Sequence, residues 1–221
     1  MNDYKSFTIQ ILNKYKCKCS QDEWKILPIH NGNKLIGFLK PITFFYNDVY
    51  PEYVFLINKW RTENTIGFTN VFENTIAKTE YWIYNLLLNR EDRILFVVHT
   101  LDDVPIGHIG LSSFNFDDKN CEIDNVVRGV KETHKGIMGF ATNSIIAWAR
   151  EVLKIEDVYL KVLSDNAHAV EFYEKNGFVK QYDIPLYITH SKDIIEWIHL
   201  DDPQDRKPDR YYRYMKLIKK I

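Results

Sequence analysis

The sequence predicts an α/β (α+β) protein whose central sheet is mixed, mostly antiparallel and flanked by helices. Three apolar runs separated by turn residues occupy 93–127 and predict a three-stranded meander. Apolar residues recur at helical spacing over 136–153 and predict one long helix. A strand over 157–162, a short helix, a strand over 178–188 and a closing strand over 211–218 complete the order.

The first part of the chain predicts a strand followed by two helices. Apolar residues over 35–43 lead into Pro41 and predict a strand or its exit. Pro51 suits the first turn of a helix that runs to about residue 61. A loop over 62–74 and a second helix over 77–88 follow.

We divide the chain at residue 34. Residues 1–34 are polar and irregularly patterned, and we expect an N-terminal extension that packs on the main domain. Residues 35–221 form one domain, which is a size that can bury a substantial core. Residues 191–209 are acidic, contain proline and predict an insertion around Trp197.

Charge and cysteine content exclude several classes of partner. The formal net charge is −1, whereas nucleic acids and anionic membranes select basic surfaces, so we expect neither partner. No apolar run reaches the ~20 residues of a membrane span. Three cysteines, Cys17, Cys19 and Cys121, form no repeating framework, which indicates a reducing compartment and a cytoplasmic protein. Their spacing predicts no metal site.

The most informative segment of the chain spans residues 164–178. Asp165 or Asn166 can cap a helix, and Ala169 and Tyr173 lie on one face of it. Gly177 suits the left-handed position that ends a helix. The pattern Asn-x-x-Ala-x-x-x-Tyr-x-x-x-Gly-Phe resembles the acyl-CoA-side signature of the GNAT acyltransferase superfamily. The order of predicted elements also matches the GNAT fold.

The resemblance implies acetyl-CoA as co-substrate, with direct transfer of its acetyl group to an amine. It implies that Asn166 contacts the pantetheine arm and that Tyr173 protonates the departing thiolate. It also implies that the strand ending at Arg128 gives a backbone N–H, which we assign to Val127, to the thioester oxygen.

A second segment, at the start of the long helix, predicts an anion site. Helix starts present unpaired N–H groups and the positive end of the macrodipole, which suits the CoA pyrophosphate. Only Gly136 matches the family's Arg/Gln-x-x-Gly-x-Gly/Ala pattern cleanly, whereas Thr133 and Met138 depart from it. The residues that we expect to contact CoA are Val126, Val127, Arg128, Thr133, His134, Lys135, Gly136, Ile137, Met138, Gly139, Asn166 and Tyr173.

The general base stays open between a pair of carboxylates, a histidine and a chain of water molecules. Glu122 and Asp124 lie two apart on one strand, so their side chains share a face. His108 lies on the neighbouring strand and can titrate near neutrality. A chain of water molecules is the third candidate.

The resemblance to the GNAT fold implies that the acceptor site lies in the first two helices and the loop between them. Trp60, Arg61, Asn64 and Phe68 combine aromatic rings, an amide and a cation, which suits a nucleotide-linked amino sugar. The alternative is that Trp60 packs in the core and Arg61 is solvated.

The run from Glu122 to Gly129, followed later by Ser164 to Asn166, resembles GNAT members that modify amino sugars and surface polysaccharides. The resemblance therefore implies an N-acetyltransferase of that type, and a homodimer is compatible with the sequence. One alternative acceptor is a protein N-terminus or a small amine, for which the acidic residues of 191–209 offer a groove. Another alternative is a CoA-binding module without catalysis, which the departures at Thr133 and Met138 favour.

Overall fold

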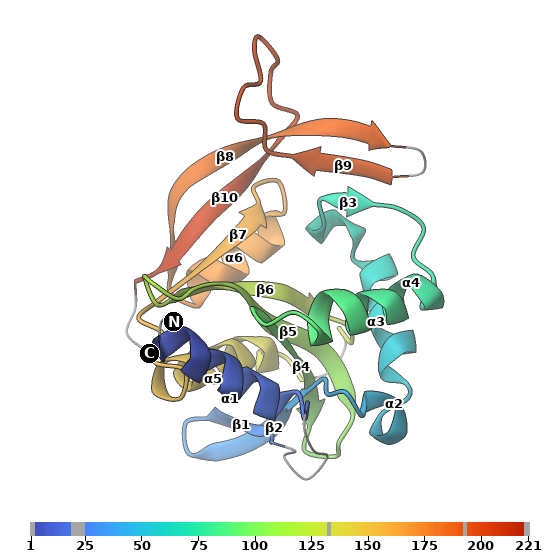
Figure 1. The fold of residues 1–221 in the computed structure, drawn as a ribbon, viewed down its shortest axis with the longest axis vertical. Helices are drawn as coiled ribbons and strands as arrows, with labels where there is room; N and C mark the ends of the chain where they lie inside the picture. Colours follow the sequence, from blue (N-terminus) through green and yellow to red (C-terminus); the bar gives the residue numbers. More distant parts are fainter. Residues whose placement is uncertain (1–2, 19–24, 132–133, 192–193, 219–221) are drawn as a thin grey trace.

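The computed structural model describes residues 3–18, 25–131, 134–191 and 194–218. Its strands form one ten-stranded sheet in the order β1-β2-β4-β5-β6-β7-β10-β8-β9-β3 (Figure 1). All neighbouring strands are antiparallel except β6 and β7, which run parallel, so the predicted mixed, mostly antiparallel sheet is confirmed. The strands are β1 (Leu27–Asn31), β2 (Lys34–Pro41), β3 (Asn70–Val71), β4 (Arg93–Thr100), β5 (Pro105–Asn115), β6 (Asn120–Arg128), β7 (Asp157–Leu163), β8 (Phe178–Ser191), β9 (Ile194–Ile198) and β10 (Arg210–Leu217).

Helices cover both faces of this sheet. The helices are α1 (Asp3–Tyr15), α2 (Tyr46–Val49), α3 (Tyr53–Glu63), α4 (Ile76–Tyr81), α5 (Ile137–Glu151) and α6 (Ala167–Lys175), with a 3₁₀ turn η2 (Thr65–Gly67) and a π-helix η3 (Trp82–Leu88) that continues α4. Side chains of α1, α5 and α6 join one buried cluster, and those of α2, α3 and η3 join a second. Alternate residues of β4 serve the two clusters: Phe96 faces the first and Val97 the second.

Residues 1–34, which we expected as an extension, contribute α1 and β1. Tyr15 packs against Trp148 of α5 with ring centroids 4.8 Å apart. Strand β1 pairs with β2, so the boundary drawn at residue 34 falls inside a hairpin. Lys16 is fully buried, and its ammonium donates to carbonyl oxygens at the end of η3, where a helix leaves its acceptors unsatisfied.

The predicted insertion over 191–209 supplies β9. This strand pairs with β8 on one side and, through Asn70 and Val71, with β3 on the other. Figure 1 shows the β8–β9 arm reaching toward β3, and the backbone N–H of Trp197 donates to the Thr69 carbonyl at 2.9 Å. The loop after α3 is therefore tied to the C-terminal part of the chain. In the described ranges, none of the helices is long and apolar enough to cross a bilayer.

Candidate active site

A cleft opens where β6 and β7 separate. The two parallel strands pair only at Asn120–Glu122 against Asp157–Tyr159. Beyond that point their facing N–H and C=O groups no longer bond each other, and a cavity of about 980 Å³ begins. Residues Asp124 to Arg128 of β6 and Lys161 of β7 line it. Two splayed strands with unpaired backbone groups can hold an extended ligand by strand-like hydrogen bonds.

A β-bulge shapes the β6 side of this cleft. His108 pairs with Val127 and Gly110 with Asp124, so two residues of β6 oppose one of β5. Asn125 takes φ = 51° there. Its carbonyl oxygen accepts the Nδ1–H of His108 at 2.6 Å, and its own N–H donates to Asp124 Oδ1 at 2.7 Å. The bulge is thus fixed from two sides.

The strand ladder decides which backbone N–H faces the cleft. The N–H of Gly129 donates to the Ile106 carbonyl of β5 at 2.9 Å. Because N–H directions alternate along an antiparallel strand, the N–H of Val127 also points toward β5, and that of Arg128 points away from it. This geometry corrects our assignment of the oxyanion donor to Val127 and favours Arg128.

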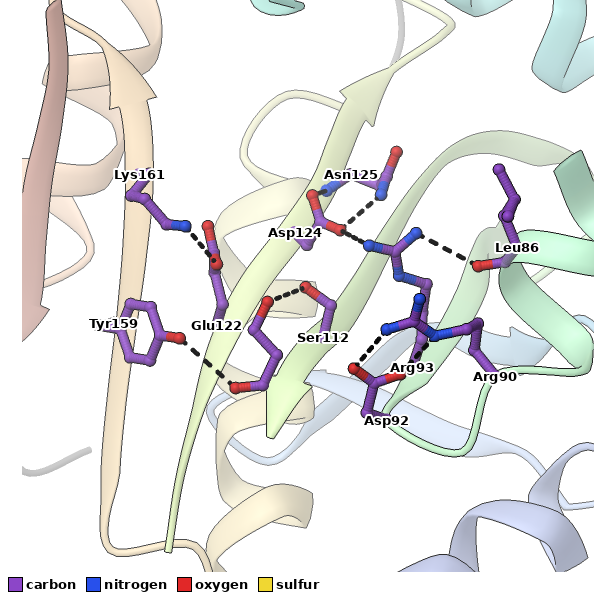
Figure 2. A network of polar contacts seen from close by, with 11 residues as sticks. Leu86, Arg90, Asp92, Arg93, Ser112, Glu122, Asp124, Asn125, Tyr159 and Lys161 are labelled. Atoms are coloured by element: carbon purple, nitrogen blue, oxygen red, sulfur yellow. Dashed lines mark hydrogen bonds and ion pairs between the residues drawn. The ribbon is translucent and has the colours of Figure 1, made fainter. Parts of the chain in front are cut away.

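Glu122 and Asp124 line the same cleft, as their spacing predicts, but their surroundings differ (Figure 2). Glu122 is 9% exposed and lies 3.1 Å from the Lys161 ammonium. Burial raises the pKa of Glu122, and the charge of Asp124 adds to this, while Lys161 opposes it. Asp124 accepts two hydrogen bonds from Asn125 and lies 3.5 Å from Arg93. Glu122 is therefore the freer proton acceptor.

His108 is almost completely buried at the cleft wall. Burial lowers its pKa to about 4, so its ring is neutral at physiological pH. Since Nδ1 carries the proton donated to Asn125, Nε2 is a bare acceptor, and it has no hydrogen-bond partner in the described part of the chain.

Helix α6 places Asn166 and Tyr173 on the opposite wall. Asn166 is the N-cap, and its Oδ1 accepts the N–H of Ala169 at 3.2 Å. Asp165, the other candidate cap, instead forms a bidentate ion pair with Arg210 at 2.8 and 2.9 Å. The Tyr173 ring is buried, and burial together with the charges of Asp124 and Glu122 raises the pKa of its phenol. Tyr173 therefore keeps its proton.

The mouth of α5 is open to solvent. Gly136 is its N-cap at φ = 85°, a conformation that favours glycine, and His134, Lys135 and Gly136 are exposed. Ile137 and Met138 are instead buried in the first core cluster, and the N–H groups of Ile137 and Gly139 already donate to the carbonyl oxygens of His134 and Gly136. Thr133 lies outside the described residues, and none of residues 134–139 lines the cleft itself. The mouth therefore lies beyond the cleft lining, and its use as a phosphate site stays a prediction.

The structure separates the four expected acceptor residues. Arg61, Asn64 and Phe68 line the cleft. Trp60 does not; it is 2% exposed in the second core cluster, so its expected contact with the acceptor is wrong. The alternative was right for Trp60 but not for Arg61, whose guanidinium lies 4.1 Å over the Phe68 ring.

Sequence reasoning missed several residues of the cleft. Among them are Lys78, Arg93, Lys131, Lys161 and Tyr212. Lys161 lies between buried residues on β7, and this alternation of polar and apolar residues could have placed its side chain on the face of the strand opposite the core. The others are brought to the cleft by long-range packing that no local pattern reports. Among the described residues, no three His, Cys, Asp or Glu side chains gather as a metal site.

Comparison with known proteins decides the family. The sequence model described as "Acetyltransferase (GNAT) family" matches residues 55–178, more than half of the chain. The chain belongs to the GNAT acetyltransferase family. Its activity is therefore acetyl-CoA-dependent N-acetyl transfer, and the splayed strands and open helix mouth suit that co-substrate.

Individual relatives of this GNAT enzyme are distant. It is 28% identical over 145 residues to an N-acetyltransferase 9-like protein of Caenorhabditis elegans, covering 59% of this chain and 72% of the relative. Spermidine N-acetyltransferase from Vibrio cholerae, solved with CoA and spermine, aligns with a TM-score of 0.58 at 18% identity, over 76% of this chain and 89% of that one. A chimera of that Vibrio cholerae enzyme aligns with a TM-score of 0.55 at 17% identity, over 81% and 93%. These structures share the fold and do not identify the acceptor. The expected resemblance to amino-sugar enzymes finds no support among these relatives.

Proposed function

We propose that this enzyme acetylates the primary amine of a nucleotide-linked amino sugar. The observation that supports this acceptor most strongly is the charge of the residues that line the cleft. Its basic lining residues are Arg61, Lys78, Arg93, Arg128, Lys131 and Lys161, and its acidic ones are Glu122 and Asp124. The cations outnumber the carboxylates, and both carboxylates are already in ion pairs, so the net charge of the cleft lining is positive. A surplus of this sign favours an acceptor that carries negative charge beside its amine.

Acetyl-CoA accounts for only part of this surplus. Arg128 and Lys131 lie at the end of β6, on the way to α5, and suit the phosphates of the co-substrate. Arg93 and Lys161 neutralise the two carboxylates, which leaves Arg61 and Lys78 for the acceptor. A polycationic acceptor would meet repulsion from these side chains, whereas a nucleoside diphosphate would be attracted.

The aromatic side chains that line the cleft support an acceptor whose uncharged part is a sugar ring or a nucleobase. The rings that line the cleft are Phe68, Phe72, Trp82, Tyr173 and Tyr212. Aromatic side chains pack well against the apolar faces of rings and leave polar edges free. The same cleft therefore offers both stacking surfaces and cations to one ligand.

For the reaction, Glu122 is proposed as the general base. When bound, acetyl-CoA supplies an activated acetyl group whose carbonyl carbon accepts the amine nitrogen. Glu122 takes the proton that this nitrogen must lose, and its raised pKa brings it closer to the pKa range of effective bases. Asp124 and His108 hold the bulge, and the N–H of Arg128 stabilises the negative charge that develops on the carbonyl oxygen.

Tyr173 is proposed as the acid that protonates the departing sulfur. In water a phenol is a weaker acid than a thiol. Burial raises the pKa of Tyr173, and burial also raises the pKa of a thiol, as it does for Cys121 on β6. A thiolate released into this cleft is therefore a stronger base than in water, and Tyr173, which keeps its proton, can donate it to the sulfur as the C–S bond breaks.

The experiment is an acceptor panel with purified enzyme and acetyl-CoA. It compares nucleotide-linked amino sugars, the same amino sugars without nucleotide, spermidine and a peptide with a free N-terminus. Thiol release and the mass of the acetylated product are measured. The proposal expects the highest kcat/KM with a nucleotide-linked amino sugar. Preference for spermidine or for the peptide contradicts it.

A further inference from the structure

A cation of the cleft is held on two aromatic rings without an acidic partner. The guanidinium of Arg61, on α3, lies 4.1 Å from the Phe68 ring centroid and 5.3 Å from that of Phe72. Such stacking fixes the plane of a guanidinium while its N–H edge stays available. In the described ranges, Arg61 takes part in no ion pair or side-chain hydrogen bond.

A second cation shares one of these rings. The ammonium of Lys78, on α4, lies 5.3 Å from the Phe72 ring centroid and donates to the Glu73 carbonyl oxygen at 2.9 Å. Both Arg61 and Lys78 line the cleft. Two like charges close to one ring repel each other, so an anion within reach of both is stabilised by both.

The acidic residues of the cleft do not satisfy these cations. Asp124 is the carboxylate whose charge reaches Arg61, but it is already engaged by Arg93 and Asn125. Glu122 is engaged by Lys161. A half-buried, unpaired guanidinium is costly in a folded protein, which is explained if its counter-charge arrives with the ligand.

We propose that Arg61, held on Phe68 and Phe72 and assisted by Lys78, binds the diphosphate of the acceptor. The planar fork of Arg61 matches two phosphate oxygens, and Lys78 adds a point charge. This subsite sets how far the amine lies from the phosphate and so selects among amino sugars. The inference rests on the proposed function in taking the acceptor to be nucleotide-linked.

The test measures binding of uridine and thymidine diphosphates to the enzyme saturated with CoA, by calorimetry. Saturation with CoA fills the co-substrate's own phosphate site, so that the remaining binding reports the acceptor side. Wild-type enzyme is expected to bind at least one of the two. Arg61→Gln is expected to weaken that binding by about ten- to a hundredfold, the usual value of a charge-assisted hydrogen-bond pair. Lys59→Gln is the matched control, because Lys59 lies on the same helix, is exposed and pairs with Glu63.

A kinetic arm separates this subsite from the proposed function. Arg61→Gln should raise KM for a nucleotide-linked amino sugar by a similar factor, and leave KM unchanged for the same sugar without nucleotide. Equal effects on both acceptors, or diphosphate binding that does not depend on Arg61, overturn the subsite even if nucleotide-linked sugars are acetylated. Arg61-dependent diphosphate binding with no acetylation of such sugars supports the subsite and overturns the proposed acceptor.

Discussion

His108 donates its Nδ1–H to the carbonyl oxygen of Asn125 across 2.6 Å, and this bond joins two strands at the β6 bulge. Because the carbonyl can only accept, the proton on the ring is fixed to Nδ1 and Nε2 is left as an acceptor. Asn125 needs φ = 51° to present its carbonyl this way. The bond therefore determines how the end of β6 meets the cleft.

The first prediction concerns stability at acidic pH. The His108 pKa is about 4 when folded and 6.5 when unfolded, so the unfolded chain binds the extra proton first. The stabilisation is present above pH 6.5 and is lost as pH falls toward 4, by roughly 3 kcal/mol in total. Urea unfolding of wild type at several pH values should show this slope.

His108→Asn removes the titrating group and keeps an N–H donor for Asn125. We expect the pH dependence between 4 and 6.5 to become shallower in this variant by the amount assigned to His108. His30→Asn, at an exposed position, is the control and should keep the wild-type slope. An unchanged slope in His108→Asn would show that other groups cause the acid sensitivity.

The second prediction tests Glu122 as the base. The carboxylate is active only when deprotonated, so kcat/KM should rise with pH through its raised pKa. Glu122→Gln should lower kcat about 10²- to 10⁴-fold and remove this acidic limb. Lys161→Met removes the cation that lowers the pKa of Glu122, and so should move the limb to higher pH.

Asp124→Asn is the contrasting variant for Glu122. The charge of Asp124 raises the pKa of Glu122, so its removal should move the limb toward lower pH without abolishing it. The pH–rate profiles of the three variants are the measurement. If the Glu122→Gln enzyme keeps both its kcat and the rise of kcat/KM with pH, Glu122 is not the base, and a water chain is left as the alternative.

The third prediction concerns Tyr173. Tyr173→Phe should lose most turnover, about a hundredfold or more, while acetyl-CoA binding is retained. Since burial raises the pKa of this phenol, wild-type activity should show no loss from its ionisation up to the ordinary tyrosine pKa of ~10. Tyr159→Phe, on β7 and outside the large cleft, is the control for loss of a hydroxyl. Unchanged turnover in Tyr173→Phe excludes the acid role.

Much of the fold follows from local patterns. The meander, α5 and α6 are marked by apolar periods, turn residues and the cap at Asn166, all of which act over a few residues. Helix α1 escaped prediction because only Thr8, Leu12 and Tyr15 of its 13 residues are buried, which leaves a narrow apolar stripe in a polar segment. Its stability comes from packing on α5, which no local pattern reports.

The site was harder to predict than the fold. The shared face of Glu122 and Asp124 follows from strand geometry alone. The pairing of β3 with β9 joins Asn70 to Glu196 and involves a two-residue strand that carries no periodic signal. The bulge at Asn125 changes the register after Asp124, which is why the direction of the Val127 N–H could not be read from the sequence.

The fourth prediction follows from the buried position of Trp60. A Cβ added at Gly129 would lie 2.0 Å from Cε2 of Trp60, so the indole occupies the space that the side chain of any other residue at position 129 would need. Gly129→Ala should therefore destabilise the protein by about 1–3 kcal/mol, since a rigid ring in a packed core has little room to move. Chemical denaturation of the variant measures this loss.

The double variant Gly129→Ala/Trp60→Leu distinguishes a steric clash from a backbone effect. Trp60→Leu alone should also destabilise the protein, because it leaves a cavity in the second core cluster. If Gly129 is required because of the indole, the double variant should lose less unfolding free energy than the two single variants lose together. The difference, which is the coupling energy, should be about 1 kcal/mol or more. Additive losses would mean that Gly129 is needed for its backbone instead. Since Gly129 follows β6 directly, Gly129→Ala should also displace the backbone beyond Arg128 and lower acetyl transfer, and the double variant should recover that activity.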